Sequence, residues 1–171
     1  TITNTGAVDP AAATNLAISE IHYHPVDGVA EEFIELVKIG TRPIDLTGAR
    51  FAAGVQFDFS TGSITTLEPG ARLLLVENRT AFEARYGAGK PIAGTFAAAT
   101  RLSNNGDRIT LLDRAGATIA DFSYGEILPW PPEADGLGWS LTLIRPELRP
   151  DPAIAANWRP SRRFLFPAPP H

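Results

Sequence analysis

The abundance of glycine and proline limits the fold of this chain more than any other feature. The 171 residues include 15 glycines and 15 prolines, and both kinds are spread over the whole length. Both residues disfavour the interior of a helix, whereas both are common in the turns that separate short strands. We therefore expect a chain built mainly from short β-strands.

Apolar and β-branched runs lie between these turns and predict the strands themselves. Residues 113–116 contain a glycine and separate two β-rich runs, which predicts an antiparallel hairpin. Helical segments do not alternate with the runs, so we expect antiparallel pairing closed into a sandwich or barrel. The predicted strands cover residues 16–23, 32–39, 50–51 with 55–59, 71–76, 108–112, 118–122 and 139–144.

One short helix is expected at residues 80–86. Thr80 occupies an N-cap position with Glu83 three residues later, and Gly87 follows as a stop signal. Phe82 and Tyr86 are four residues apart and share a helix face, so we expect that face to pack on the sandwich.

Composition excludes several classes of chemistry. Hydrophobic residues make up 44% of the chain and charged residues 20%, which is ordinary for a globular domain. The absence of cysteine excludes disulfides, thiolate nucleophiles and cysteine-based zinc sites. A net charge of -4 argues against nucleic-acid binding, which uses clustered Lys and Arg. Arg159, Arg162 and Arg163 form a local basic group, and we expect them to keep a tail solvated.

Residues 1–14 are small and polar and are expected to be a leader or linker, residues 15–161 the folded domain, and residues 162–171 a disordered tail or a linker to a further module. The chain begins at Thr1 and contains no methionine, so we expect a segment of a longer protein. No apolar run approaches the roughly 20 residues that span a bilayer, so no transmembrane segment is expected.

Several motifs then occur in an order that points to a family. The run Ile-Ser-Glu-Ile-His-Tyr-His-Pro at 18–25, followed by Glu-Glu-Phe-Ile-Glu-Leu at 31–36, resembles the opening of the lamin tail domain in its bacterial form. Two positions depart from that pattern: Lys38 stands where the family usually has Asn, and Ala49 where it has a bulky aromatic residue. Further matching motifs occur at 45–48, 67–70, 102–107, 113–116, 124–125, 129–131, 135–136, 140–141 and 157–158.

This resemblance implies an all-β, immunoglobulin-like antiparallel sandwich with one short helix. It also implies a non-enzymatic interaction or tethering module of a larger exported bacterial protein, located outside the cell or in the cell envelope. The implied partners are another protein or an envelope component, together with neighbouring modules of the same parent chain. Fold alone does not establish such a role, because function depends on individual sites.

Four residues are the candidates for a metal site. Glu20, His22 and His24 share one face of the first strand if the period is two, and Glu35 lies on the next strand. Such side chains can bind Zn²⁺ or Ca²⁺. However, no established metal-binding spacing is present, so we expect them to form hydrogen bonds or cross-strand pairs. We therefore expect no cofactor and no metal, with Ca²⁺ bound by these four residues as the alternative.

Catalysis is not expected. The chain has no Gly-x-Ser-x-Gly motif, and Ser19 would lie on the face of the first strand opposite to His22. The third histidine, His171, stands at the end of the tail. We therefore expect no enzyme activity.

The Pro-rich segment around Trp130 is the candidate for a ligand or partner contact. Trp130 stands between two prolines, where an exposed ring could stack on a sugar or a peptide proline, or could fold back onto the sandwich. Asp135 lies in the same segment and is the second candidate contact. The alternative function is an accessory module that binds carbohydrate or nucleic acid: an exposed aromatic platform around Trp130 would favour carbohydrate, and a continuous basic stripe would favour nucleic acid.

Overall fold

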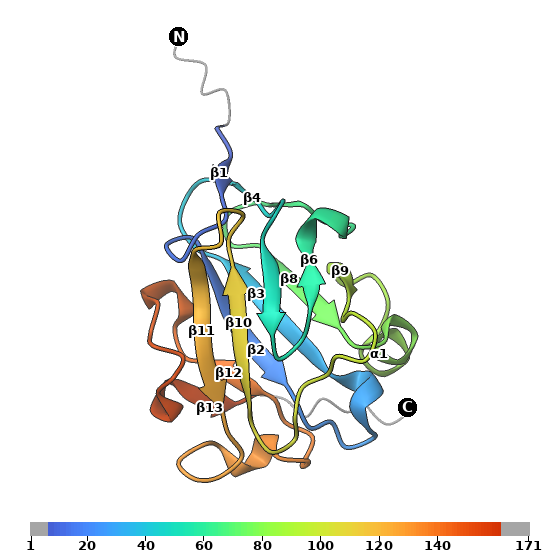
Figure 1. The fold of residues 1–171 in the computed structure, drawn as a ribbon. Coiled ribbons are helices and arrows are strands. Elements are labelled where there is room, and N and C mark those ends of the chain that lie inside the picture. The colour runs from blue at the N-terminus through green and yellow to red at the C-terminus, as the bar shows by residue number, and fades with distance from the viewer. Residues whose placement is uncertain (1–6, 162–171) are drawn as a thin grey trace.

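Two β-sheets form the main layers of the protein, and a hydrophobic core lies between them (Figure 1). The computed structural model describes residues 7–161. The larger sheet has the order β13-β12-β2-β3-β8-β9, and the smaller has the order β11-β10-β5-β6. The strands of the larger sheet are β2 (Leu16–His22), β3 (Phe33–Lys38), β8 (Arg72–Val76), β9 (Ile92–Thr95), β12 (Leu141–Leu143) and β13 (Trp158–Pro160). Those of the smaller sheet are β5 (Arg50–Ala53), β6 (Phe57–Asp58), β10 (Asp107–Leu112) and β11 (Thr118–Tyr124).

Short elements complete the architecture. A third, small sheet has the order β1-β4-β7, with β1 at Asp9–Pro10, β4 at Ile44–Asp45 and β7 at Thr66–Leu67. The helix α1 spans Arg79–Tyr86, and five 3-10 turns lie at Val29–Glu31 (η1), Phe59–Thr61 (η2), Pro132–Ala134 (η3), Pro146–Leu148 (η4) and Ala155–Asn157 (η5). The expected all-β sandwich with one short helix is therefore confirmed.

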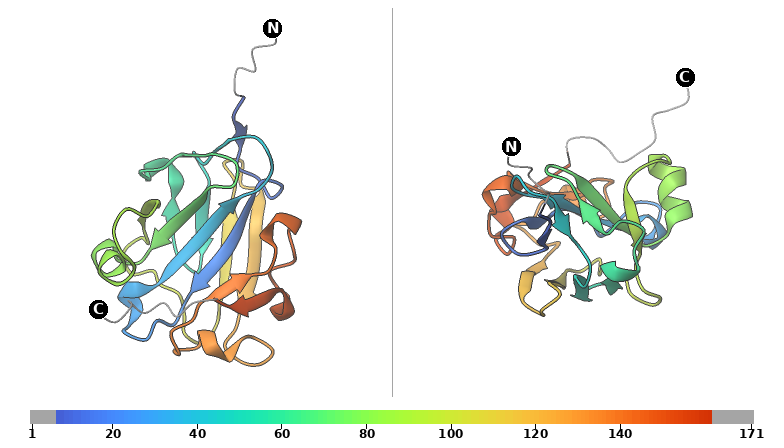
Figure 2. Two further views of the ribbon diagram at one scale, coloured as in Figure 1. Left: turned by 180° about the vertical axis from the view of Figure 1, so that it is seen from behind. Right: turned by 90° about the horizontal axis from the view of Figure 1, so that it is seen from above.

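Side chains along β3 are buried alternately in two separate hydrophobic clusters. Ile34 and Leu36 are buried in the main core between the sheets. Phe33 joins Leu74, Val76, Phe82 and Ile92 in a second cluster. The second cluster lies under α1, which packs on β3, β8 and β9 near one edge of the larger sheet (Figure 2). A period of two explains the division, since neighbouring residues of a strand point to opposite faces.

The expected packing of the helix is confirmed, but its expected start is wrong. Tyr86 lies 5.7 Å from Phe33 between ring centroids, in an edge-to-face arrangement. The N-cap is Asn78, whose Oδ1 accepts a hydrogen bond from the amide of Ala81 at 3.0 Å. Thr80 lies inside the helix, and Glu83 pairs with Arg79 at 3.0 Å and makes no capping box. Gly87 ends the helix with φ at 94°, as expected.

Two strand pairs are parallel, which the sequence did not indicate. β8 and β9 are parallel, and α1 supplies the crossover between them. β1 pairs with β4 in parallel through Asp9 and Pro10, and the adjacent Ala11 is buried. These residues fall within the expected leader. The domain boundaries at 15 and 161 stay a prediction, and Arg162, Arg163 and His171 lie outside the described residues.

No helix within residues 7–161 is long and apolar enough to cross a bilayer.

Candidate binding surface

One loop at an end of the sandwich displays large apolar side chains to solvent. Residues 125–140, here called the Trp130 loop, connect β11 to β12 and are orange in Figure 1. Within this loop Ile127 is 71% exposed, Leu128 76% and Leu137 59%. Ile127 and Leu128 are the two most exposed large hydrophobic residues of the described chain. Grouped exposed apolar side chains commonly mark a protein-interaction site.

Trp130 anchors this loop to the sandwich. Its ring is only partly exposed and packs against the main core, with its centroid 6.4 Å from that of Trp158. A Cβ atom on Gly125 would lie 2.9 Å from Cδ1 of Trp130, so the ring occupies space that only glycine leaves open. Of the two arrangements weighed for Trp130, the structure has the one in which the ring folds back. A direct ligand contact by Trp130 stays a prediction.

Asp135 fastens the other half of the loop. Its Oδ1 lies 2.7 Å from Nδ1 of His24, which follows the end of β2. The neighbouring Gly136 has φ at +76°, and a Cβ there would lie 3.2 Å from Cε1 of His24. Positive φ and the adjacent imidazole together favour glycine at position 136. Asp135 thus holds the loop in place, and its role as a partner contact stays a prediction.

The two glutamates proposed as metal ligands are neighbours. Glu20 and Glu35 lie opposite each other on β2 and β3. Glu20 accepts a hydrogen bond from the hydroxyl of Ser140, and Glu35 accepts one from Ser19 at 2.7 Å. Burial, aided by the charge of Glu35, raises the pKa of Glu20 to about 7. These contacts match the expectation of hydrogen bonding to neighbouring groups.

The two histidines lie in different surroundings. His22 is buried beside Phe33, with ring centroids 5.4 Å apart, and burial lowers the pKa of its imidazole to about 3. His24 faces Asp135 in the Trp130 loop. Across residues 7–161 no three His, Asp or Glu side chains lie close enough together to hold a metal ion. The structure therefore does not gather Glu20, His22, His24 and Glu35 around one point.

A further buried carboxyl lies outside the four metal-site candidates. Glu32 is fully buried, and its Oε2 accepts a hydrogen bond from the amide of Leu102 at 2.8 Å. Burial raises the pKa of Glu32 to about 8, although the hydrogen bond acts in the opposite direction. Glu32 thus joins the start of β3 to the segment before β10. This is a structural role and does not expose the carboxyl to a ligand.

The exposed apolar residues of the Trp130 loop were also missed by sequence reasoning. The available signal was the pair Ile127-Leu128 between Gly125 and Pro129, where no strand alternation requires apolar side chains. Trp130 drew attention to the loop because tryptophan often contacts ligands. The structure shows instead that Trp130 supports the residues that face solvent.

The comparisons with known proteins agree with this architecture. No curated protein matches the chain. The family model of the Lamin Tail Domain matches residues 9–126, which end where the Trp130 loop begins. Domains of this family have an immunoglobulin-like fold and are generally not catalytic. This chain, by that match and by its sandwich fold, belongs to the lamin tail domain family.

Proposed function

We propose that this domain is a non-catalytic interaction module of a larger exported bacterial protein, and that it binds a partner protein through the Trp130 loop. The observation that carries the proposal is the exposure of Ile127 and Leu128 on a loop whose base is fixed. Trp130 fixes one side of that base and the His24–Asp135 pair fixes the other.

The energetics of binding favour such a loop. Fully burying a leucine or isoleucine side chain against a partner contributes roughly 1.5–3 kcal/mol. A loop already held in one conformation loses less entropy when it binds than a mobile loop does. Two exposed apolar side chains on an anchored loop therefore form a small preorganised contact, which suits tethering.

The family resemblance and the net charge support the proposed partner and location. We infer a location outside the cell or in the cell envelope, with a protein or envelope component as partner, because the resemblance to the bacterial form of the lamin tail domain implies an exported protein. A net charge of -4 disfavours nucleic acid. The alternative of a carbohydrate-binding module would need a free aromatic platform, whereas the Trp130 ring packs on the core.

Site-specific photo-crosslinking tests the proposal. A photoreactive amino acid replaces Leu128 in the parent protein produced by its own cells, and Glu68, on an exposed turn, carries it as the control. We expect a discrete protein adduct at position 128 that is absent at position 68. The adduct should disappear when a competing copy of the domain is added, but persist when that copy carries Ile127→Ser and Leu128→Ser.

Two results would overturn the proposal. One is the absence of any adduct at position 128 under conditions where the reactive group is consumed. The other is competition by the serine variant as strong as that by the unaltered domain. Circular dichroism of the serine variant is the control for folding. We expect an unchanged spectrum and an unchanged midpoint of thermal unfolding because both side chains are solvent-exposed.

A further inference from the structure

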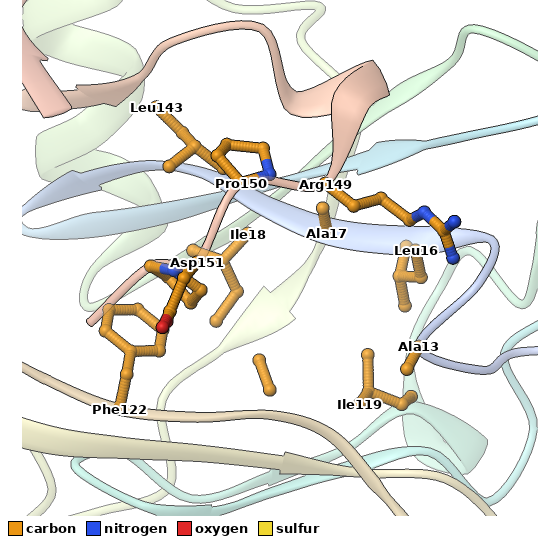
Figure 3. Close-up of a pocket in the computed structure, with 12 residues that line it drawn as sticks. Ala13, Leu16, Ala17, Ile18, Ile119, Phe122, Leu143, Arg149, Pro150 and Asp151 are labelled. Carbon is orange, nitrogen blue, oxygen red and sulfur yellow. The ribbon is translucent and has the colours of Figure 1, made fainter. Parts of the chain in front are cut away.

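A small apolar pocket opens between the two sheets, away from the Trp130 loop. Figure 3 shows its walls, with residues of β2 on one side and residues of β11 on the other. The cavity has a volume of about 170 Å³. An apolar cavity of about 150 Å³ holds one benzene ring, so this pocket has the size for one leucine, isoleucine or phenylalanine side chain. Its apolar lining includes Leu16, Ile18, Ile119, Ala120, Phe122 and Leu143.

The mouth of the pocket carries an unpaired positive charge. Arg149 is one of the lining residues (Figure 3), and its guanidinium makes no hydrogen bond or ion pair with any residue between 7 and 161. Asp151 also lines the pocket, where its carboxylate accepts a hydrogen bond from the amide of Ala153 at 2.9 Å and makes no ion pair with Arg149. Arg149 is therefore the charged group here that has free N–H donors, which an acidic group of a ligand complements.

The strand beside the pocket has a free edge. Among residues 7–161, β11 is the outermost strand of the smaller sheet and pairs with β10 alone. In an antiparallel strand, alternate residues point their backbone N–H and C=O groups away from the paired neighbour. Within the described chain these outward groups of residues 118–124 have no backbone partner. Such an edge is a template for an added strand.

We propose that an extended segment of a partner protein adds to the edge of β11, inserts one apolar side chain into the inter-sheet pocket, and places an acidic side chain against Arg149. Residues two apart in a strand lie on the same face, about 6.8 Å from each other. An apolar residue and an acidic residue at this spacing would reach the pocket and its rim together. The inference rests on the interaction role proposed above but uses a different surface.

Defined peptides test this assignment on the whole chain. The probes are blocked seven-residue peptides of threonine with a leucine at the centre and an aspartate two residues before or two residues after it. A matched set carries lysine in place of aspartate. Binding is followed by NMR chemical shifts and by amide exchange of β11. We expect one aspartate peptide to bind, with protection of amides in residues 118–124.

Two charge reversals separate the proposed site from general electrostatics. Arg149→Glu should weaken the aspartate peptide at least tenfold and should make the lysine peptide the better ligand. Arg145→Glu is the matched control, because Arg145 has nearly the same left-handed φ, 51° against 50°, yet does not line this pocket. Ala120→Leu, which partly fills the pocket, should weaken the binding of both peptides. Unchanged NMR chemical shifts in the larger sheet would show that this variant is still folded.

Three outcomes would overturn the inference: equal losses from Arg149→Glu and Arg145→Glu, peptide shifts confined to the Trp130 loop, or no peptide binding at millimolar concentration. A further probe, octanoate, distinguishes a small apolar acid from a peptide. If octanoate binds in an Arg149-dependent manner and the peptides do not, the pocket serves a small molecule and the proposal is wrong. Because Ile127 and Leu128 lie outside the pocket, failure here leaves the Trp130 loop and its crosslinking test unaffected.

Discussion

Nδ1 of His24 and Oδ1 of Asp135 lie 2.7 Å apart and join positions separated by 111 residues in the chain. This contact ties the Trp130 loop to the end of β2. Both side chains are more than one third exposed, so their interaction should stabilise the fold by less than about 1 kcal/mol. Its main effect should be local.

We expect Asp135→Ala to leave the thermal midpoint within a few degrees of the unaltered domain but to accelerate amide exchange across residues 126–138. Hydrogen exchange read by mass spectrometry measures this directly. Glu133→Ala, in the same loop, is the control and should leave the exchange unchanged. Equal acceleration in both variants would mean that the His24–Asp135 contact does not hold the loop.

Gly136 offers a stronger perturbation of the same contact. Its φ of +76° disfavours any residue with a Cβ, and the added atom would lie 3.2 Å from the His24 ring. We expect Gly136→Ala to destabilise the domain by about 1 kcal/mol or more, measured by urea denaturation. Gly70→Ala has the same sign of φ but open space around the Cβ, so it should show the backbone effect alone and a smaller loss.

The cap of α1 yields a direct comparison of two residues. Asn78 accepts a hydrogen bond from the amide of Ala81, whereas Thr80, the cap expected from sequence, lies inside the helix. Removing a capping side chain destabilises a protein by about 1 kcal/mol. We expect Asn78→Ala to lower the unfolding free energy by that amount and Thr80→Ala to change it little. Denaturant titration measures both unfolding free energies. A larger decrease for Thr80→Ala than for Asn78→Ala would contradict the assignment of Asn78 as the N-cap.

The sequence located those elements whose side chains carry their own pattern. β3 and the two strands of the β10–β11 hairpin are each six or seven residues long, contain several apolar residues and are bounded by turns, and they appear within a residue or two of the expected bounds. Strands β1, β4, β7, β9 and β13 were missed because each has only two to four residues. So short a run shows no periodicity, and its pairing is decided by the partner strand.

The candidate surface was found only in part for a similar reason. Trp130 and Asp135 were visible as unusual residues of a loop, but their roles depend on Trp158, Gly125 and His24, which are distant in the chain or lack a side chain. Asn78 and Thr80 are both good caps, and only the helix register distinguishes them. Long-range contacts of this kind are set by tertiary packing, which one sequence does not display.

The buried carboxyl of Glu32 predicts how stability changes with pH. Burial raises the pKa of Glu32 to about 8, from an ordinary value of 4.5 in the unfolded chain. Between these two values the folded state holds a proton that the unfolded state has released, so stability falls as pH rises through this window. One proton limits the slope to at most about 1.4 kcal/mol per pH unit.

We expect Glu32→Gln to remove this part of the pH dependence. The side-chain oxygen of glutamine can still accept the hydrogen bond from the amide of Leu102. The carboxamide group does not ionise between pH 5 and 8. In urea denaturation at pH 5, 6, 7 and 8, the unfolding free energy of the variant should increase relative to that of the unaltered domain as pH rises. Glu20 titrates in both proteins and cancels in the difference. Glu68→Gln is the exposed control, and a difference between Glu32→Gln and the unaltered domain that does not vary with pH would contradict the prediction.

The left-handed backbone at Arg149 makes it possible to test the role of this side chain in peptide binding without destabilising the fold. Its φ is 50°, a conformation that costs a residue with a Cβ roughly 1–2 kcal/mol and glycine almost nothing. Glycine also gains freedom in the unfolded chain, which offsets about 0.4–1 kcal/mol of the relief. We therefore expect Arg149→Gly to leave the thermal midpoint unchanged or to raise it by about 2–4 °C, while the aspartate peptide loses its affinity.

Arg145→Gly, at φ of 51°, should change stability in the same way and leave peptide binding intact. Arg159→Gly provides the opposite case, because Arg159 lies in the extended strand β13, where glycine is destabilising by roughly 0.5–1 kcal/mol. Thermal melts of the three variants beside peptide titrations make the comparison. If Arg149→Gly destabilises the domain as Arg159→Gly does, the arginine supports the fold at that position, and a loss of peptide binding would no longer identify Arg149 as a contact.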